Sequence, residues 1–335
     1  MLACANEPIY DGATESRLSI AIRLLAARTN WHAPEKCLDF IKMLNDVVPK
    51  QNFLPKNYYE AKRVVSTLWL KAGKIDCCEA GCMLYYKDDI ELTESKFCGL
   101  PRYFPLKGQK RRYTNVPIKR MFYLPIIPRL QRLYTSMEST SQMRWHFENK
   151  NDDGLLRHPC DGKAWKHFDR VYPDFVADPR HVRLGLCSDG FTPYIQASTS
   201  SYSCWPVFVT PYNLPPEMCM TKPYMFLTSI IPGPSNPTKK IDVYLQPFIA
   251  ELQQLWNEGV LTYNISSKEN FLMQACLMWT INDFLAYDML SGWGTKGKLA
   301  CPYCMKDTKA FTLKHEGKSS WFDCYRRFMR IQENS

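Results

Sequence analysis

No segment of this sequence approaches the roughly 18 consecutive apolar residues that a membrane-spanning helix needs. Its first eleven residues contain no basic stretch followed by an apolar one, so we expect no secretory signal. There is also no internal repeat and no low-complexity tract. The lack of a long apolar segment argues against a membrane protein. The lack of an export signal favours a reducing compartment, in which the 14 cysteines would be buried thiols or metal ligands rather than disulfides.

The composition is that of a globular protein. Of the 335 residues, 45% are hydrophobic and 23% are charged, so the chain can bury a substantial core, and its length favours about two domains. Lysine and arginine number 43 against 33 acidic residues, which gives a formal net charge of +10. This excess fits a polyanionic partner such as nucleic acid, although many basic proteins have no such partner.

The patterns along the chain predict three regions. Residues 1–74 contain three stretches with apolar residues at helical spacing, which predict a helical N-terminal region. Residues 75–140 carry cysteines and then basic residues, and we interpret them as a cysteine-containing and basic linker region. Residues 141–335 alternate strand-like and helix-like runs, which predict an α/β domain.

Within the α/β region, three strand-like runs precede a helix and a fourth strand. The helix is amphipathic, and a glycine ends it. The strands are expected at 182–187, 204–210, 224–231 and 271–281, and the helix at 241–259.

Two aspartates follow apolar strand-like runs in this region. Asp189 ends the first run and precedes a glycine, and Asp283 ends the last one. Acids at the ends of neighbouring strands can converge and share a hard divalent cation, Mg²⁺ or Mn²⁺, which in turn can promote phosphodiester chemistry. The structural alternative is that the first aspartate belongs to an Asp-Gly turn and the second caps a helix.

Two groups of cysteines have spacings that are found in zinc sites. Cys301 and Cys304 form a CxxC pair, which can bind one Zn²⁺ from a tight turn. The downstream candidates for further ligands are His315 and Cys324. The spacing from Cys304 to His315 is short for a typical four-ligand site, so the set is incomplete. A redox pair is the alternative, although no thioredoxin-like context surrounds it.

The second group lies earlier in the chain and contains Cys78, Cys82 and Cys98. Three ligands do not complete a tetrahedral zinc site. The alternative interpretation is a set of small buried thiols.

A basic segment covers residues 102–134. It contains nine lysines and arginines with interleaved aromatic residues, and no acid occurs between Glu94 and Glu138. Such a segment can contact phosphates and stack on bases, or it can be a solvated basic loop. The candidate DNA-contacting residues are Arg102, Lys107, Lys110, Arg111, Arg112, Lys119 and Arg120.

A series of ordered sequence blocks resembles the transposase of plant CACTA (En/Spm-type) transposons, over about residues 58–328. The most specific blocks are 157–169 (RHPCDGKAWKHFD), 182–191 (VRLGLCSDGF), 241–247 (IDVYLQP), 279–283 (WTIND) and 300–304 (ACPYC).

The resemblance implies an RNase H-like core with a DDE/D acid triad, which cuts DNA at transposon ends and joins it to a target with Mg²⁺ or Mn²⁺. Asp189 matches the first acid of this triad and Asp283 the second. The resemblance also implies a nuclear location and DNA as the partner. It further implies a homo-oligomer or a second transposon-encoded protein as an additional partner.

The sequence departs from the family pattern at several places. The third acid and a histidine ligand expected after Cys304 are not found in this sequence, Leu285 replaces a proline after the second acid, and Ser95 stands where the pattern has a cysteine. We therefore expect an incomplete fragment, with the core truncated at its C-terminal end, that is inactive as an enzyme. The alternative is a transposon-derived protein that binds DNA without catalysis.

Overall fold

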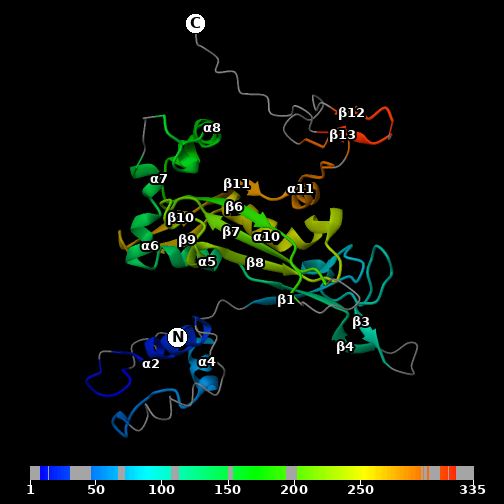
Figure 1. Cartoon of the computed structure of the whole chain (residues 1–335). Coiled ribbons are helices and arrows are strands. Elements are labelled where there is room, and N and C mark those ends of the chain that lie inside the picture. Colours follow the sequence, from blue (N-terminus) through cyan, green and yellow to red (C-terminus); the bar gives the residue numbers. More distant parts are fainter. Residues whose placement is uncertain are drawn as a thin grey trace. The chain divides into compact units, whose positions relative to one another are not determined.

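The structure is a computed structural model that describes residues 8–13, 15–30, 47–66, 72–106, 113–149, 154–193, 202–295, 297, 300–301, 310–315 and 317–321. The chain divides into two compact units, Met1–Lys71 and Ala72–Ser335. Figure 1 shows both units, coloured along the sequence.

The first unit contains two described helices, α2 (Arg17–Asn30) and α4 (Tyr58–Ser66). They pack through small apolar residues, because Ala21 of α2 is buried together with Ala61 and Val64 of α4. The second of the three helical stretches predicted for this region, at about residues 34–48, lies largely outside the described residues.

The second unit is built on a seven-stranded mixed sheet. The strands are β1 (Gly73–Cys77), β2 (Leu84–Tyr85), β5 (Lys119–Tyr123), β6 (Val182–Ser188), β7 (Trp205–Pro211), β8 (Phe226–Ile231) and β11 (Ala275–Ile281). They lie in the spatial order β11-β6-β7-β8-β5-β1-β2. Neighbouring strands are antiparallel except β6 and β11, which are parallel. The predicted α/β class is therefore confirmed as a mixed sheet with helices.

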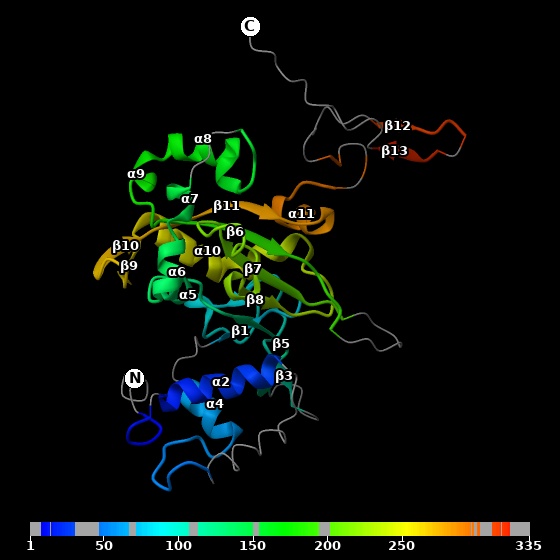
Figure 2. The ribbon, with the colours of Figure 1, turned by 60° about the vertical axis from the view of Figure 1, so that its left-hand side comes forward.

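The connection from β8 to β11 contains a long helix and a hairpin. The helix α10 (Ile241–Asn257) buries Tyr244, Leu245, Phe248 and Leu255 in the main core. The hairpin of β9 (Val260–Asn264) and β10 (Glu269–Met273) follows it. In both views α10 runs alongside the strands, and α11 (Phe284–Ser291) follows directly from the end of β11 (Figures 1 and 2).

Short helices and ribbons surround the sheet. The helical elements are η2 (Lys87–Asp89), α5 (Ile127–Leu133), α6 (Met137–Gln142), α7 (Trp145–Glu148), η3 (Pro159–Asp161), α8 (Lys163–Val171), α9 (Pro173–Val176), η4 (Lys222–Tyr224) and η5 (Thr238–Lys240). The ribbons pair β3 (Tyr103–Pro105) with β4 (Tyr113–Pro117), and β12 (Ala310–Thr312) with β13 (Ser319–Trp321). None of the helices in the described part of the chain is long and apolar enough to cross a lipid bilayer.

A buried arginine fixes α8 against the sheet. Arg183 of β6 is only 1% exposed. Its Nη2 lies 2.9 Å from the Asp169 carboxylate of α8, and its guanidinium group lies over the Trp165 ring at 4.7 Å. Because a buried cation is costly without partners, this ion pair and ring contact explain how a charged residue is tolerated in an apolar strand.

The predicted strand at 271–281 is two strands in the structure. Residues 269–273 pair with β9, whereas residues 275–281 pair with β6. Gln274 separates the two, and its side-chain amide donates to the Trp256 carbonyl at the end of α10. A continuous apolar run can therefore serve two different strand pairings.

Candidate functional site

The two aspartates that follow apolar runs lie at the ends of neighbouring strands. Cys187 of β6 is in register with Ile281 of β11, and the two strands run in parallel. Asp189 and Asp283 each follow two residues later along their strand. Because adjacent strands lie about 4.8 Å apart, this register brings both residues to the same edge of the sheet.

Hydrogen bonds tie these strand ends together. The backbone N–H of Ser188 donates to the Asn282 side-chain oxygen at 3.2 Å, which links the ends of β6 and β11. The Ser188 hydroxyl donates to the Pro206 carbonyl of β7 at 3.0 Å. The residues immediately before both aspartates are therefore held in place across three strands.

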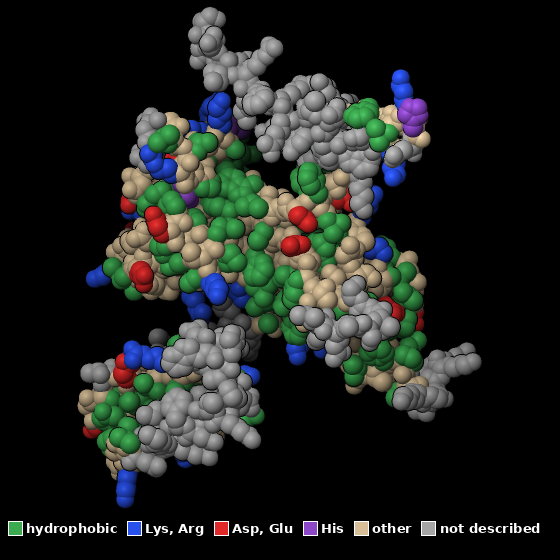
Figure 3. All heavy atoms as spheres, viewed as in Figure 1, with side chains coloured by type: hydrophobic (Ala, Val, Ile, Leu, Met, Phe, Trp, Pro, Cys, Tyr) green, Lys and Arg blue, Asp and Glu red, His purple; other side chains and the backbone are tan. Residues whose placement is uncertain are grey.

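A single pocket of about 340 Å³ contains both carboxylates in its lining. Both aspartates are exposed, so ions and ligands can reach them. Figure 3 shows acidic side chains close together next to α11 on this face of the second unit. Among the described residues that line the pocket, these two are the only acids. The other lining residues are Cys187, Ser188, Gly190, Phe191, Pro206, Phe208, Ile281 and Asn282.

The turn after Asp189 needs a glycine. A Cβ atom on Gly190 would lie 2.7 Å from the ring of Trp205, which is 2% exposed and cannot move easily. The next residue, Phe191, pairs with Cys204 in an isolated bridge. The Asp-Gly turn of the sequence is thus packed on a buried tryptophan, which fixes where the chain leaves β6.

Each carboxylate has one oxygen in a local hydrogen bond. Oδ1 of Asp283 accepts from the Ala286 N–H at 2.8 Å and caps the N-terminus of α11. Oδ1 of Asp189 accepts from the Gly190 N–H at 2.7 Å. The helix cap that we considered as a structural alternative is therefore present, and it occupies only one oxygen of Asp283.

The donor set of this pocket is chemically suited to a hard cation. Two carboxylates and an amide side chain line it, and oxygen ligands of this kind are preferred by Mg²⁺ and Mn²⁺.

The three early cysteines form a compact cluster. The Sγ atom of Cys78 lies 3.3 Å from that of Cys82 and 3.4 Å from that of Cys98, and the third Sγ–Sγ distance is 3.4 Å. Ser95 lies beside them, with its Oγ 3.1 Å from Cys82 Sγ. Hydrogen bonds, first from Ser95 and then from the backbone of Leu100, lower the pKa of Cys98 to about 7, whereas burial raises the pKa of Cys82 to about 11.

The second cysteine group is described only in part. Cys301 is buried and His315 is exposed, whereas Cys304 and Cys324 lie outside the described residues. The zinc site predicted at Cys301 and Cys304 therefore stays a prediction.

The predicted DNA-contacting residues that the structure describes are engaged within the protein. Arg102 and Arg120 both pair with the Asp76 carboxylate, at 2.8 Å and 2.6 Å, and Asp76 is 4% exposed. Lys119 donates to the Tyr244 hydroxyl at 2.9 Å, and burial lowers the pKa of Lys119. The remaining candidates, which lie outside the described residues, are Lys107, Lys110, Arg111 and Arg112. A role in DNA contact stays a prediction for all seven.

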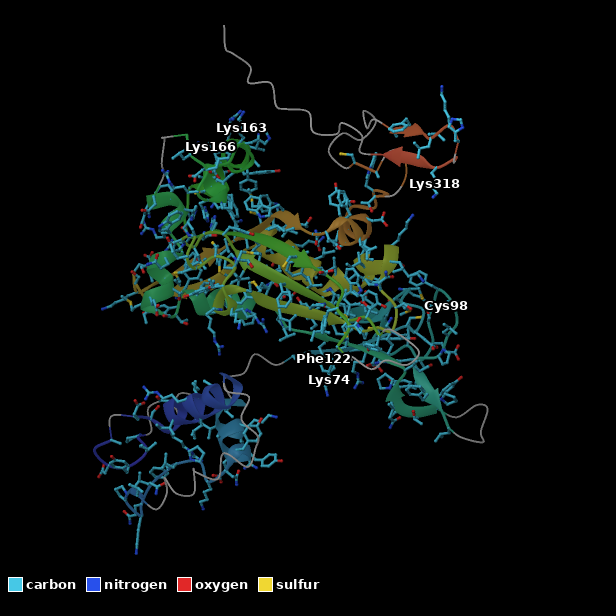
Figure 4. All side chains as sticks on the ribbon, in the orientation of Figure 1. Lys74, Cys98, Phe122, Lys163, Lys166 and Lys318 are labelled. Atoms are coloured by element: carbon cyan, nitrogen blue, oxygen red, sulfur yellow. The ribbon has the colours of Figure 1, made fainter. Side chains whose placement is uncertain are left out.

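The helix α8 carries a basic face that is not among the predicted DNA-contacting residues. Lys163, Lys166 and Arg170 are exposed at helical spacing, while Trp165 faces inward and is 2% exposed. Figure 4 shows Lys163 and Lys166 on the side of α8 that faces away from the sheet. This face is visible in the sequence, because the basic and the aromatic residues of the segment fall on opposite faces when it is placed on a helix.

Comparison with known proteins identifies the family. No curated protein matches this sequence. The model of the transposase family tnp2 (Transposase_21) matches residues 153–335, which is more than half of the chain. The match includes both pocket aspartates and α8, whereas the cluster of Cys78, Cys82 and Cys98 lies outside it. The chain thus belongs to the tnp2 family of transposases.

Proposed function

We propose that this chain carries the metal-binding part of a CACTA (En/Spm-type) DNA transposase, which cuts DNA at transposon ends and joins it to a target. The observation that carries this proposal is the shared pocket of Asp189 and Asp283, at the ends of two parallel neighbouring strands. The chain belongs to a transposase family, and a divalent cation held by two carboxylates can promote the phosphodiester chemistry of DNA transposition.

The topology supports an RNase H-like identity for the core. Three antiparallel strands, β6, β7 and β8, are followed by the crossover helix α10 and by β11, which returns to lie parallel beside β6. This is the arrangement that the resemblance implied, with the first acid after the first strand and the second acid after the last. The β9–β10 hairpin is an insertion in that scheme.

In the proposed site, Asp189 and Asp283 would hold Mg²⁺ or Mn²⁺ through their carboxylate oxygens. When bound, such an ion would polarise phosphate oxygens of DNA. Asn282 and Ser188 would act as positioning residues, since their hydrogen bond fixes the separation of the two strand ends. Gly190 would give the turn room above Trp205.

We further propose that the chain on its own binds the cation but does not cleave DNA. Support comes from the pocket, where the described lining includes two acids rather than three. The second candidate function is DNA binding without catalysis, by a transposon-derived protein located in the nucleus. It would act as a homo-oligomer or together with a second transposon-encoded protein.

The exposed basic stripe of α8 is the DNA-contacting element that the described structure favours. Its three cations are Lys163, Lys166 and Arg170, and the first two point away from the core in Figure 4. Phosphate contacts of this kind contribute affinity without sequence specificity.

Binding of Mn²⁺, followed by electron paramagnetic resonance, tests the acid pair. We expect weak binding by the unmodified chain and a loss of affinity by roughly tenfold or more in Asp189→Asn and in Asp283→Asn, because ligand charge sets cation affinity. Asp288→Asn on α11 is the matched control, since Asp288 does not line the pocket, and it should bind as the unmodified chain does.

Unchanged Mn²⁺ affinity in both pocket variants would contradict the shared site.

Nicking of supercoiled DNA in the presence of Mn²⁺ separates the two candidate functions. Nicking that disappears in Asp189→Asn would show an active transposase core, whereas salt-dependent DNA binding without nicking supports the non-catalytic protein.

A further inference from the structure

We infer that Cys78, Cys82 and Cys98 bind one structural Zn²⁺ through three thiolates, and that Ser95 occupies the fourth corner of this site. The three sulfur atoms lie within 4.8 Å of one another, and no other group of three potential ligands does so in the described part of the chain. This site is separate from the acid pocket and lies outside the part of the chain that matches the transposase family.

Two tight turns present the four side chains. In the first turn, the Cys78 N–H donates to the Met83 carbonyl at 3.0 Å, and the Gly81 N–H donates to the Cys78 carbonyl at 2.9 Å. In the second turn, the Ser95 N–H donates to the Leu100 carbonyl at 2.9 Å. Each turn thus supplies two of the four corners, which is the usual construction of a structural zinc site.

Ser95 lies where the fourth ligand of such a site would be. It is 4% exposed, and its Oγ lies 3.1 Å from Cys82 Sγ. The same oxygen is within 3.3 Å of the Phe97 N–H nitrogen and 3.4 Å of the Cys98 N–H nitrogen, both of which donate to it. A serine hydroxyl is a weaker zinc ligand than a thiolate, so we assign three strong ligands and one weak oxygen position.

Neither simple thiol burial nor a disulfide accounts for the geometry of the cluster. Cys98 is exposed, so burial of a small apolar thiol does not explain its position. A disulfide would join two sulfurs at about 2.05 Å and leave the third without a role, whereas the three observed separations are nearly equal.

The proposed site would order one end of the sheet. A Cβ atom on Gly81 would lie 2.6 Å from the Tyr244 hydroxyl of α10, so the first turn fits closely against that helix. Lys240 also donates to the Ala80 carbonyl at 2.8 Å. Figure 4 shows Cys98 beside the sheet end that carries β1 and β2. Metal binding would therefore stabilise this end against α10.

Substitution with Co²⁺ tests the site in the full chain. Cys301 and Cys304 are replaced by serine in every sample, so that this second cysteine pair does not contribute to the signal. Thiolate-to-cobalt charge-transfer absorption measures the number of bound thiolates. We expect one Co²⁺ per chain, displaced by Zn²⁺, and no tetrahedral spectrum in Cys82→Ser.

Ser95→Cys provides the decisive comparison, because it adds a ligand rather than removing one. We expect its charge-transfer intensity to rise toward that of four thiolates and its zinc affinity to increase about tenfold or more. Cys160→Ser, a change to a cysteine elsewhere in the fold, is the matched control and should leave both quantities unchanged. Absent charge-transfer bands in the unmodified cluster, a disulfide found by thiol titration, or unchanged intensity in Ser95→Cys would each overturn the inference.

Discussion

Asp283 serves two purposes with one side chain. One oxygen of its carboxylate caps α11, and the same side chain lines the pocket opposite Asp189. A cap needs only a hydrogen-bond acceptor, whereas cation binding needs negative charge. Asparagine preserves the first property and removes the second, so the two roles can be separated by substitution.

We expect Asp283→Ala to lower the free energy of unfolding by about 1 kcal/mol, and Asp283→Asn to leave it nearly unchanged. Both variants should lose Mn²⁺ affinity, since neither carries the charge. Urea unfolding without metal, together with a Mn²⁺ titration, measures the two effects. Equal destabilisation by both substitutions would show that the cap contributes through charge rather than through hydrogen bonding.

At the scale of elements, η3 depends on an uncharged histidine. The Nδ1 atom of His158 accepts from the Cys160 N–H at 3.2 Å, which requires that nitrogen to carry no proton. The ring is 5% exposed and lies edge-on to Trp145. Burial lowers the pKa of His158 from 6.5 to about 4.

This pKa shift predicts acid sensitivity. Between pH 6.5 and about 4, the unfolded chain takes up a proton at His158 that the folded chain does not, so stability falls as the pH is lowered. The full contribution is on the order of 3 kcal/mol. His158→Asn keeps an acceptor that does not titrate, and its unfolding free energy should decline less steeply over this range. Identical pH slopes for the two proteins would rule out a buried neutral histidine.

The elements that could be predicted from sequence are those with a strong local pattern. The predicted strands at 182–187, 204–210 and 224–231 match β6, β7 and β8 closely. The predicted helix at 241–259 corresponds to α10, which ends at Asn257, two residues before Gly259 with its φ of 70°. The β9–β10 hairpin is not predicted, because the apolar residues of β10 run on into those of β11 and form one continuous stretch. Hydrophobic pattern alone does not show with which strand a residue pairs.

For the candidate site, the sequence indicated which acids follow strands but not their surroundings. The pairing of Arg102 and Arg120 with Asp76 joins residues 26 and 44 positions apart. No local pattern reveals such a contact, so the sequence shows a basic segment that can contact phosphates or be solvated, but not that these two arginines are paired. Conversely, the basic face of α8 could have been found, because its helical spacing is visible in the sequence.

At the scale of the whole molecule, we expect DNA binding to depend on the α8 stripe. Reversing charge in Lys163→Glu or Lys166→Glu should weaken affinity for duplex DNA independently of its sequence. Each variant should also lower the salt slope by about 1 for each DNA phosphate that the protein no longer neutralises. Fluorescence anisotropy over a range of salt concentrations measures both quantities.

Lys268→Glu in the β9–β10 turn provides the control, because this lysine is also exposed but belongs to a different element. If it weakens binding as much as the α8 variants do, the effect reflects net charge rather than a defined contact.

The start of α11 at the acid pocket has a consequence for how ligands would be taken up. A helix N-terminus carries partial positive charge, which disfavours a cation nearby and favours an anion. A lone divalent ion would therefore bind the acid pair poorly, whereas an ion accompanied by a DNA phosphate would satisfy both the carboxylates and the helix. Ion and DNA should then bind cooperatively, with each raising the affinity for the other by the same factor.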